Sequence, residues 1–372
     1  MAVADAAPLY LGLISGTSAD GIDAALVCFA PRLEVIAAHT FPYPDDLRRR
    51  IVALARSDAA LALDDLGHLD VEIGERFAEA ALALLREANV APSAITALGS
   101  HGQTVCHRPS GPHPFTSQLG DPNVVAERTG IVAVGDFRRT DVAAGGQGAP
   151  LLPALHAAVL ADTVTPRAIL NLGGIANLTL LVPDRPVLGF DTGPANCLMD
   201  AWSLRVRGTP RDDAGVWARS GRVDQALLAR LLDDPYFSAS PPKSTGREVF
   251  NNDWLDARLP QGLAPENVQA TLLLLSARSI AGAVRDHAPE VREVYACGGG
   301  VHNGALMDVL RGQLPNVKVE TTAALGLDPD FVEAVGFAWL ARARLENMPG
   351  NLPSVTGARG PRVLGAIYAA PR

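Results

Sequence analysis

The sequence predicts an α/β protein made of two similar lobes. Its 372 residues are enough for two domains, and a content of 48% hydrophobic and 19% charged residues is typical of a globular chain. Two stretches, near residues 8–29 and 168–182, have the same layout of apolar strand, small-residue turn and apolar strand. Because each stands at the head of about half of the chain, they predict two lobes of similar design.

The first of these hairpins contains a turn that is suited to an anion. Pro8–Ile14 and Ile22–Phe29 are apolar and predict strands, and Ser15–Gly21 connects them. The glycines allow close backbone approach, and successive N–H groups can surround phosphate oxygens. The turn has no lysine and no helix after it, so it is not a Walker P-loop. An ordinary hairpin turn remains the alternative.

Asp20 within this turn has a different predicted role. A carboxylate is repelled by phosphate, so its expected function at a phosphate site is to hold Mg²⁺ through water. The two lysines of the chain, Lys243 and Lys318, lie elsewhere. Phosphate recognition is therefore left to backbone N–H groups, arginine and metal.

Charge and composition exclude several classes of protein. The net charge of −8 argues against a sequence-independent nucleic-acid binder. Ala270–Val284, the most apolar long run, contains Arg278 and is too short to span a bilayer. The four cysteines form no C-x-x-C pair, and the N-terminus has no signal-peptide pattern. We therefore expect a cytoplasmic protein with no membrane partner.

Two further strand ends carry polar groups, the feature expected of a ligand-facing edge. The short strand Ile95–Leu98 is predicted to end at Gly99–Thr104, which contains Ser100 and His101. A histidine that serves only the structure is the alternative reading for His101.

The second such strand, Ile131–Gly135, is followed by Asp136–Asp141, which contains Arg138, and then by the glycine-rich Gly145–Pro150. A site edge and a salt-bridged turn explain this stretch equally well. Gly145–Pro150 is the expected hinge or lobe boundary.

Asp191 is the candidate catalytic base. It follows the predicted strand Val187–Phe190 and precedes the predicted helix Ala195–Val206. A helix N-terminus lowers the pKa of a nearby carboxylate and keeps it ionised. N-capping of that helix is the competing role for Asp191.

The C-terminal half adds two more candidate elements. A predicted strand, Val291–Cys297, leads through glycines into the predicted helix Gly304–Leu314, an arrangement suited to the phosphates or sugar of a nucleotide. Glu333 lies near the start of the predicted helix Pro329–Glu346, where stabilisation of the helix end is the alternative role.

With these motifs identified, the chain resembles the anhydro-N-acetylmuramic acid kinases of the actin, hexokinase and heat-shock ATPase superfamily. The resemblance runs from Leu11 to Tyr368. It rests on seven motifs in order: residues 15–23, 99–104, 136–150, 189–194, 242–248, 297–300 and 349–358. Ala19 departs from the larger apolar residue expected at its position.

The resemblance implies a two-lobed actin-like (ribonuclease H-like) ATPase fold with ATP in the cleft between the lobes. Residues 1–145 and about 330–372 would form the first lobe, and residues 146–329 the second. The implied reaction uses ATP and water to convert 1,6-anhydro-N-acetylmuramic acid into N-acetylmuramic acid 6-phosphate, during recycling of bacterial cell-wall fragments. Mg²⁺ and a homodimer are also implied.

The resemblance and the motifs together give a set of expected site residues. Asp191 is the catalytic base, and Asp20 is the metal ligand. Ser100, His101, Arg138 and Glu333 are placed at the sugar. The nucleotide is expected to contact Gly16, Thr17, Ser18, Ala19, Asp20, Gly21, Ile22, Asp23, Gly173, Gly174, Gly298, Gly299, Gly300 and Asn303. Another small-molecule kinase of the same superfamily, or a non-catalytic ATP-driven clamp, is the alternative function.

Overall fold

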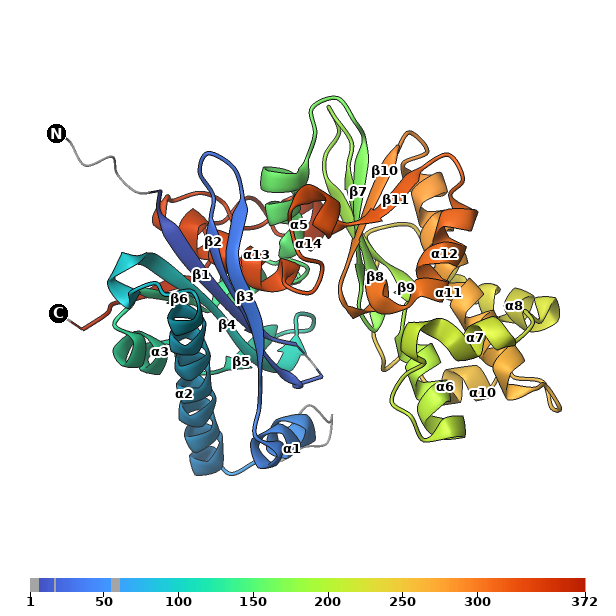
Figure 1. Cartoon of the computed structure of the whole chain (residues 1–372), viewed down its shortest axis with the longest axis horizontal. Helices are drawn as coiled ribbons and strands as arrows, with labels where there is room; N and C mark the ends of the chain where they lie inside the picture. The colour runs from blue at the N-terminus through green and yellow to red at the C-terminus, as the bar shows by residue number, and fades with distance from the viewer. Residues whose placement is uncertain (1–6, 17, 55–60, 372) are drawn as a thin grey trace. The chain divides into compact units, whose positions relative to one another are not determined.

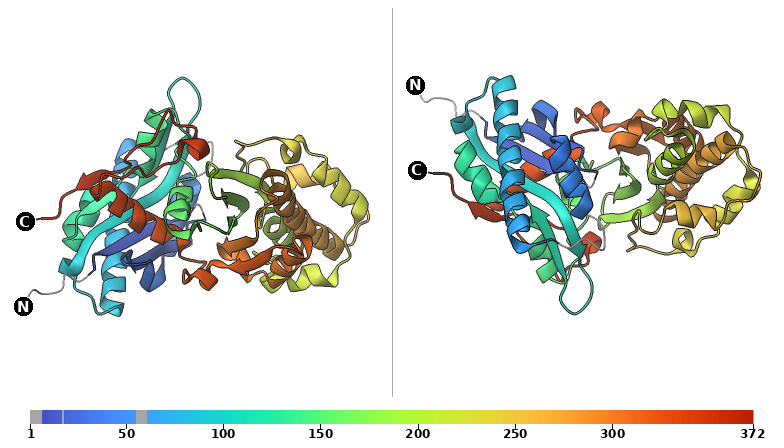
Figure 2. Two further views of the ribbon diagram at one scale, coloured as in Figure 1. Left: turned by 90° about the horizontal axis from the view of Figure 1, so that it is seen from above. Right: turned by 90° about the horizontal axis from the view of Figure 1, so that it is seen from below.

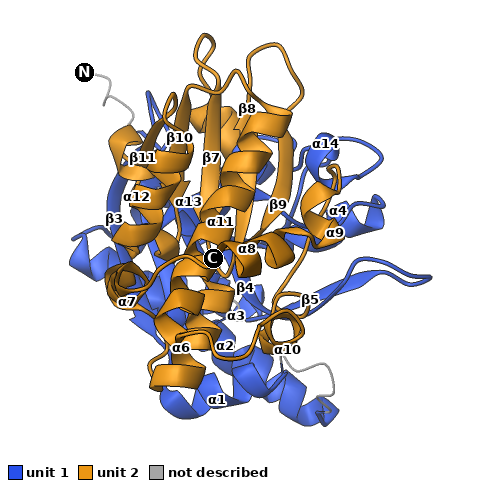
Figure 3. Ribbon diagram, turned by 90° about the vertical axis from the view of Figure 1, so that its right-hand side faces the viewer, with its two compact units in different colours: residues 1–155, 331–372 blue, residues 156–330 orange. Residues whose placement is uncertain are grey.

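The computed structural model shows a chain that folds into two compact units (Figure 1). It describes residues 7–16, 18–54 and 61–371. Unit 1 comprises residues 1–155 and 331–372, and unit 2 comprises residues 156–330, as coloured in Figure 3. The chain therefore leaves unit 1 ten residues after the expected boundary at 145–146 and re-enters it at Phe331.

The sheet of unit 1 has the strand order β12-β6-β4-β1-β2-β3, and β5 pairs with the far end of β4. β1, β2 and β3 form an antiparallel meander, and β4 and β6 are added in parallel on the other side of β1. The strands are β1 (Leu9–Ser15), β2 (Gly21–Cys28), β3 (Glu34–Pro42), β4 (Ile95–Arg108), β5 (Phe115–Leu119), β6 (Ala133–Gly135) and β12 (Ala366–Tyr368).

The sheet of unit 2 has the order β11-β10-β7-β8-β9. β7, β8 and β9 form the antiparallel meander, and β10 and β11 continue in parallel from β7. The strands are β7 (Arg167–Leu172), β8 (Ile175–Leu181), β9 (Leu188–Pro194), β10 (Glu293–Cys297) and β11 (Lys318–Thr321).

Both sheets thus share one order, third-second-first-fourth-fifth, when strands are counted from the start of each hairpin and β5 and β12 are set aside. This is the ribonuclease H-like arrangement, so the fold class predicted from the sequence is confirmed. The two similar hairpins occupy equivalent positions in their sheets, as β1–β2 and β7–β8.

In unit 1, helices α2 and α13 cover opposite faces of the sheet and can be followed in Figures 1 and 2. Gly12 and Gly99 lie directly under the backbone of α13, whereas Leu13 and Leu98 face the core that includes α2. The helices of this unit are α1 (Asp45–Leu54), α2 (Leu63–Glu87), α3 (Pro122–Thr129), α4 (Phe137–Ala143), α5 (Leu152–Leu155), α13 (Val332–Leu345) and α14 (Pro353–Thr356).

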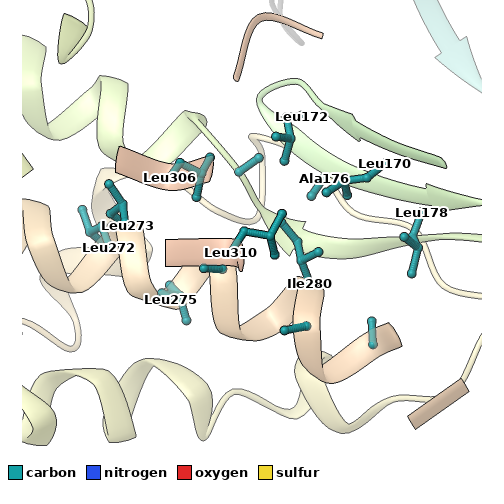
Figure 4. Packing of buried hydrophobic residues seen from close by; sticks show 14 of the residues in the cluster. Leu170, Leu172, Ala176, Leu178, Leu272, Leu273, Leu275, Ile280, Leu306 and Leu310 are labelled. Carbon is teal, nitrogen blue, oxygen red and sulfur yellow. The ribbon is translucent and has the colours of Figure 1, made fainter. Parts of the chain in front are cut away.

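The core of unit 2 lies between its sheet and the long helix α11. Figure 4 shows Leu170 and Leu178 of the sheet and Leu272, Ile280 and Leu310 of the helices, which belong to one cluster of buried side chains. The helices are α6 (Cys197–Arg207), α7 (Val216–Ser220), α8 (Gln225–Leu232), α9 (Pro235–Ser238), α10 (Asn252–Asp256), α11 (Pro265–His287) and α12 (Gly304–Gln313). Across the described residues, no helix is long and apolar enough to cross a membrane.

Two strands are longer than the sequence predicted. β4 does not stop at Leu98 but continues to Arg108, because β5 pairs with its second half, so Gly99–Thr104 lies inside the strand. β9 likewise runs through Asp191, which pairs with Asn177 of β8. The sequence predicts a strand end at the polar residues of both segments. In the structure, pairing with β5 and β8 continues the strands through these residues.

The glycine-rich Gly145–Pro150 is not a free connection. Gly148 N donates to Asp141 Oδ2 at 2.8 Å, and Gln147 N donates to Thr356 O at 2.7 Å. These bonds tie the loop to α4 and to the C-terminal segment within unit 1. The structure therefore gives no support for a hinge at this position.

The contact between Gly99 and α13 gives a first prediction. A Cβ at Gly99 would lie 2.0 Å from Phe337 O, so Gly99→Ala should push α13 away and lower the free energy of unfolding by about 2 kcal/mol. Gly67→Ala is the matched control, because it lies in α2 with no atom within 4 Å of the added Cβ. This control should raise stability by about 0.5–1 kcal/mol. Urea denaturation measures both; equal stability of the two variants would contradict the contact.

Candidate active site

The turn between β1 and β2 is held by a side chain from β4. Ser15 Oγ donates to Gln103 Oε1 at 2.6 Å, and Gln103 Nε2 donates to Gly16 O at 3.1 Å. Ala19 N donates to Gly16 O at 3.0 Å, which closes the turn, and Ala19 has a positive φ of 50°. Thr17 lies outside the described residues. Gln103 of β4 thus holds the conformation of this turn, although sequence reasoning assigned that segment to the sugar.

Asp20 forms an ion pair with Arg48 of α1, whose Nη2 lies 2.6 Å from Asp20 Oδ1. Both side chains are about half exposed or more. Sequence reasoning missed Arg48 because it lies 28 residues after Asp20 in the chain. The guanidinium places a positive charge beside a turn that contains no lysine.

The turn offers Mg²⁺ one carboxylate ligand, Asp20. No group of three or more His, Cys, Asp or Glu side chains suited to a metal occurs in the part of the chain that the structure describes. Asp20 is therefore a single carboxylate. Mg²⁺ is usually held by one or two carboxylates together with substrate phosphates and water, and Asp20 fits that pattern.

The residues assigned to this turn fall into two groups. A Cβ on Gly16 would meet nothing within 4 Å, whereas one on Gly21 would lie 2.7 Å from Phe41 O of β3. Ile22 is buried in the core, and Asp23 accepts a hydrogen bond from Thr40 Oγ1 at 2.6 Å. Gly16 is thus open to a ligand, while Gly21 has a packing role in the sheet.

The second hairpin turn is held by the segment that precedes α6. Asn196 Nδ2 donates to Gly173 O at 2.7 Å, and Ala195 N donates to Gly174 O at 2.9 Å. The guanidinium of Arg247 lies over Gly174, where an added Cβ would be 2.8 Å from Arg247 Nε. Arg247 belongs to a motif used for the resemblance, but it is not among the site residues expected from the sequence. Its position makes it the cation of this turn.

The Gly298–Gly300 segment follows β10, as predicted. Gly298 has a φ of +79°, a conformation that favours glycine, and a Cβ there would lie 2.4 Å from Asn171 Oδ1. Asn303 caps α12, because its Oδ1 accepts a hydrogen bond from Leu306 N at 3.1 Å. The Asn303 side chain therefore has a structural function in addition to the predicted ligand contact.

Asp191 lies within β9, where two donors hold its carboxylate. Asn177 Nδ2 donates to Oδ1 at 2.9 Å, and Thr245 N donates to Oδ2 at 3.0 Å. Burial raises the pKa of Asp191, and the two hydrogen bonds oppose that rise. The expected lowering of this pKa by a helix N-terminus is wrong in direction. α6 begins only at Cys197, and burial outweighs the other effects.

The loop before α10 completes the surroundings of Asp191. Tyr236 OH donates to Asp191 O at 2.7 Å, and Lys243 Nζ donates to Tyr236 O at 3.0 Å while lying 4.7 Å from the centre of its ring. Lys243 thus braces the loop. Thr245 Oγ1 is buried and has no hydrogen-bond partner in the described structure. Thr245 therefore donates its N–H to Asp191 and also carries a hydroxyl without a partner.

His101, which is buried, and Arg138, which is partly buried, form a hydrogen-bonded pair in unit 1. Arg138 Nε donates to His101 Nε2 at 2.8 Å, and His101 Nδ1 donates to Gly102 O at 2.9 Å, so the imidazole is neutral. Burial, then the charge of Arg138, hold the pKa of His101 well below its usual value. Burial also lowers the pKa of Arg138 to about 10, while the charge of Glu333 opposes this. Three of the four predicted sugar residues thus come together.

Asp141 is connected to Arg138 through Gly148, and sequence reasoning did not assign it a function. It is fully buried, and its Oδ1 accepts from Asn351 Nδ2 at 2.6 Å and from Thr356 Oγ1 at 2.8 Å. Its other oxygen accepts from Gly148 N, and Gly148 O accepts from Arg138 Nη1 at 2.7 Å. Asp141 therefore links the C-terminal segment to the position of Arg138.

Ser100, the fourth predicted sugar residue, points away from the other three. Successive side chains of a strand alternate between faces. Gly99 lies under α13, so Ser100 points to the face that carries α2 and α3. The His101 ring packs on Phe337 of α13, with 4.5 Å between ring centres. The structure thus separates Ser100 from the His101–Arg138 pair.

The two α/β units have the same strand order, and each begins with a hairpin whose small-residue turn lies beside an arginine. These features are those of the two-lobed actin-like ATPases and sugar kinases. A sequence profile described as anhydro-N-acetylmuramic acid kinase matches residues 8–370. The chain belongs to the anhydro-N-acetylmuramic acid kinase family, and it is a kinase. The resemblance inferred from the motifs is confirmed.

Relatives named anhydro-N-acetylmuramic acid kinase cover nearly the whole chain. One from Xanthomonas campestris pv. campestris (strain 8004) is 56% identical over 368 residues, which is 98% of each chain. Another, from Coxiella burnetii (strain Dugway 5J108-111), is 51% identical over 362 residues, 96% of this chain and 97% of the relative. Among solved structures, component A of the Acidaminococcus fermentans (R)-2-hydroxyglutaryl-CoA dehydratase has a TM-score of 0.45 at 12% identity, covering 91% of this chain and 100% of that one. A likeness of that degree carries no functional argument.

The neutral state of His101 gives a prediction about pH. At pH values above about 6.5 both the folded and the unfolded imidazole are uncharged. Below that value only the unfolded chain takes up the proton, because burial depresses the folded pKa. This histidine should therefore lower the free energy of unfolding by up to about 1.4 kcal/mol for each pH unit below 6.5. Urea unfolding at pH 7.5 and 5.5 of the native protein and of His101→Gln tests this. An equal loss in both proteins would contradict it.

Proposed function

We propose that this kinase converts 1,6-anhydro-N-acetylmuramic acid, ATP and water into N-acetylmuramic acid 6-phosphate and ADP, in recycling of cell-wall fragments. The observation that carries the proposal is the carboxylate of Asp191. It is partly buried and held by two donors, and burial raises its pKa, which makes it a stronger base. We also propose, from the family resemblance, that the enzyme acts in the cytoplasm as a homodimer.

The turns supply the binding groups for the nucleotide. In unit 1 the proposed phosphate contacts are N–H groups of the turn between Gly16 and Asp20 other than that of Ala19, which donates to Gly16 O, with Arg48 beside the turn. In unit 2 they are Gly173, Gly174 and Gly298–Gly300, with Arg247 over the hairpin turn. Asp20 would hold Mg²⁺, which supplies charge stabilisation to a transferring phosphoryl group. Binding of that ion would require Asp20 to loosen its pair with Arg48.

The chemistry follows from the substrate. In an ordinary sugar kinase a base removes a proton from the attacking hydroxyl. In the anhydro sugar, O6 is bonded to C1 and has no proton. The proposed step is that Asp191 takes a proton from a water whose oxygen adds to C1. The C1–O6 bond breaks, and O6 forms its bond to the γ-phosphorus as the bond to ADP breaks. The unpartnered hydroxyl of Thr245 is a second group available to hold that water.

The His101–Arg138 pair in unit 1 is assigned to the sugar. The substrate carries a carboxylate on its lactyl group, and a guanidinium binds a carboxylate through a planar fork. Arg138 supplies that guanidinium, oriented by the neutral His101 and by Gly148 O. Glu333 would accept from a sugar hydroxyl. A kinase for a free hydroxyl or a carboxylate is the alternative, and it needs no water at C1.

Asp191→Asn keeps the shape of the residue and removes the base. Turnover should fall by about 10²–10⁴-fold while both substrates still bind. Thr245→Val removes the free hydroxyl but retains the N–H to Asp191, so it should lower turnover by a smaller factor, about tenfold. Asp253→Asn, on the exposed surface of α10, is the control and should have native activity. The assay is ADP release, with sugar and nucleotide binding followed by calorimetry. Native turnover in Asp191→Asn would refute the assignment.

The source of the oxygen at C1 separates the proposed reaction from the alternative. When the reaction is run in ¹⁸O-labelled water for a short time at low temperature, one labelled oxygen should appear on C1 and none in the phosphate. Mass spectrometry of the product and its fragments locates the label. Label in the phosphate, or a product that retains the anhydro bridge, would overturn the hydrolytic route.

Gly16→Val tests the phosphate turn. Because nothing lies within 4 Å of the new Cβ, the fold should tolerate it. The branched side chain would cover the N–H groups of the turn and should weaken Mg-ATP binding about tenfold or more. Calorimetric titration measures the affinity, and a native urea midpoint confirms that the variant folds. Native affinity in a folded variant would rule out this turn as the phosphate site.

A further inference from the structure

Unit 1 contains a pocket that the proposed chemistry does not use. Its volume is about 280 Å³, and it lies at the end of β6, beside α2 and the start of α3. The main chain of His101 borders the pocket, because the imidazole packs on α13. The groups that matter below are Asp70, Ser100, Asp121, Asp136, Arg139 and Tyr368.

Ser100 is the first sign that the pocket accepts a ligand. Its side chain is only 2% exposed, and its Oγ has no hydrogen-bond partner in the described structure. A buried hydroxyl without a partner is costly, and folded proteins nearly always satisfy such groups. Because Gly99 faces α13, the Ser100 side chain points to the opposite face, where this pocket lies. A bound molecule there would complete its hydrogen bonding.

The second sign is the charge of the walls. One oxygen of Asp70 accepts from Gly120 N at 2.7 Å, and one oxygen of Asp121 accepts from Asn123 N at 2.8 Å. Asp136 has an ion pair with Arg139, at 3.4 Å. Three carboxylates therefore face one guanidinium, which leaves an excess of two negative charges.

Burial shows that these charges are not simply solvated. It is the largest influence on the carboxyl groups of Asp70 and Asp136, and it raises the pKa of each. The hydroxyl of Tyr368 lies close enough to the aspartates for their charges to raise its own pKa further. The pocket thus holds negative charge in partly dehydrated surroundings, where a cation is stabilised more than in water.

The geometry points to one ligand class. An anion such as a phosphate or a carboxylic sugar would be repelled, and a neutral polyol would leave the charge uncompensated. A metal ion is disfavoured because the described residues contain no suitable cluster of three ligands. We propose that this pocket binds a small organic cation with primary ammonium groups, which donate hydrogen bonds to the free carboxylate oxygens and to Ser100 Oγ. The site is separate from the proposed catalytic groups.

Three probes of similar size test the proposal: 1,4-diaminobutane, 1,4-butanediol and succinate. They differ only in carrying two positive charges, none or two negative charges. Calorimetric titration into the full chain at pH 7.5, without nucleotide or sugar, should show saturable binding of the diamine. Its affinity should exceed that of the diol by about tenfold or more, with no binding of succinate. Failure of this experiment leaves the kinase assignment untouched, since neither substrate is present.

Variants locate the binding. Asp70→Asn and Ser100→Ala should each weaken diamine binding by about fivefold to tenfold. Ser100→Ala removes a hydroxyl that has no partner, so its urea midpoint should be native or higher, which shows that a loss of binding is not a loss of fold. Asp253→Asn removes one negative charge from unit 2 and should leave binding unchanged. Equal affinity for diamine and diol, no binding of the diamine, or native diamine affinity in either pocket variant would overturn the proposal.

Discussion

The contact of α13 with the two central strands of unit 1 determines how that unit is built. Gly12 of β1 and Gly99 of β4 have no side chains, so the helix backbone lies directly on the sheet; a Cβ at Gly12 would be 1.9 Å from Ala334 O. This close approach brings a helix from the C-terminal end of the chain onto strands from its N-terminal end. Glu333, at the start of the helix, then acts on Arg138, and Phe337 packs on His101. Three of the four predicted sugar residues, His101, Arg138 and Glu333, come together beside this contact.

The two units support their hairpin turns in comparable ways with different residues. In unit 1 the amide of Gln103 binds Gly16 O, and in unit 2 the amide of Asn196 binds Gly173 O. In each case a side-chain amide donates to a turn carbonyl, so the conformation of the turn is held by another segment of its own unit. An arginine lies beside each turn, Arg48 in the first and Arg247 in the second. The shared strand order thus comes with a shared way of presenting a turn.

The sequence predicted the parts that depend on local pattern. The hairpins, the long helix α2 and the helix α12 after Gly298–Gly300 follow from hydrophobic spacing and turn residues. It did not predict the length of β4 or the position of Asp191, because strand pairing with β5 and β8 depends on residues that the local pattern does not contain. Ser100 and His101 were assigned to one site, although alternation along a continuous strand places their side chains on opposite faces.

Contacts between distant segments were also beyond sequence reasoning. Asp141 looks like a polar residue of a turn, yet it is fully buried because Asn351 and Thr356, more than two hundred residues later, surround it with donors. A buried carboxylate is stable only when its oxygens accept hydrogen bonds. Those donors come from the C-terminal segment, and nothing in the local pattern around Asp141 indicates them.

The same rule explains the chemistry available to Asp191. Burial raises its pKa, because an ionised carboxylate is less stable away from water. The amide of Asn177 and the N–H of Thr245 stabilise the ionised form and limit that rise. The carboxylate is thus a stronger base than one in water, and its ionised form accepts two hydrogen bonds. Lys243 and Tyr236 hold the loop that carries Thr245, so the whole segment from Tyr236 to Thr245 contributes to the protonation state of one carboxylate.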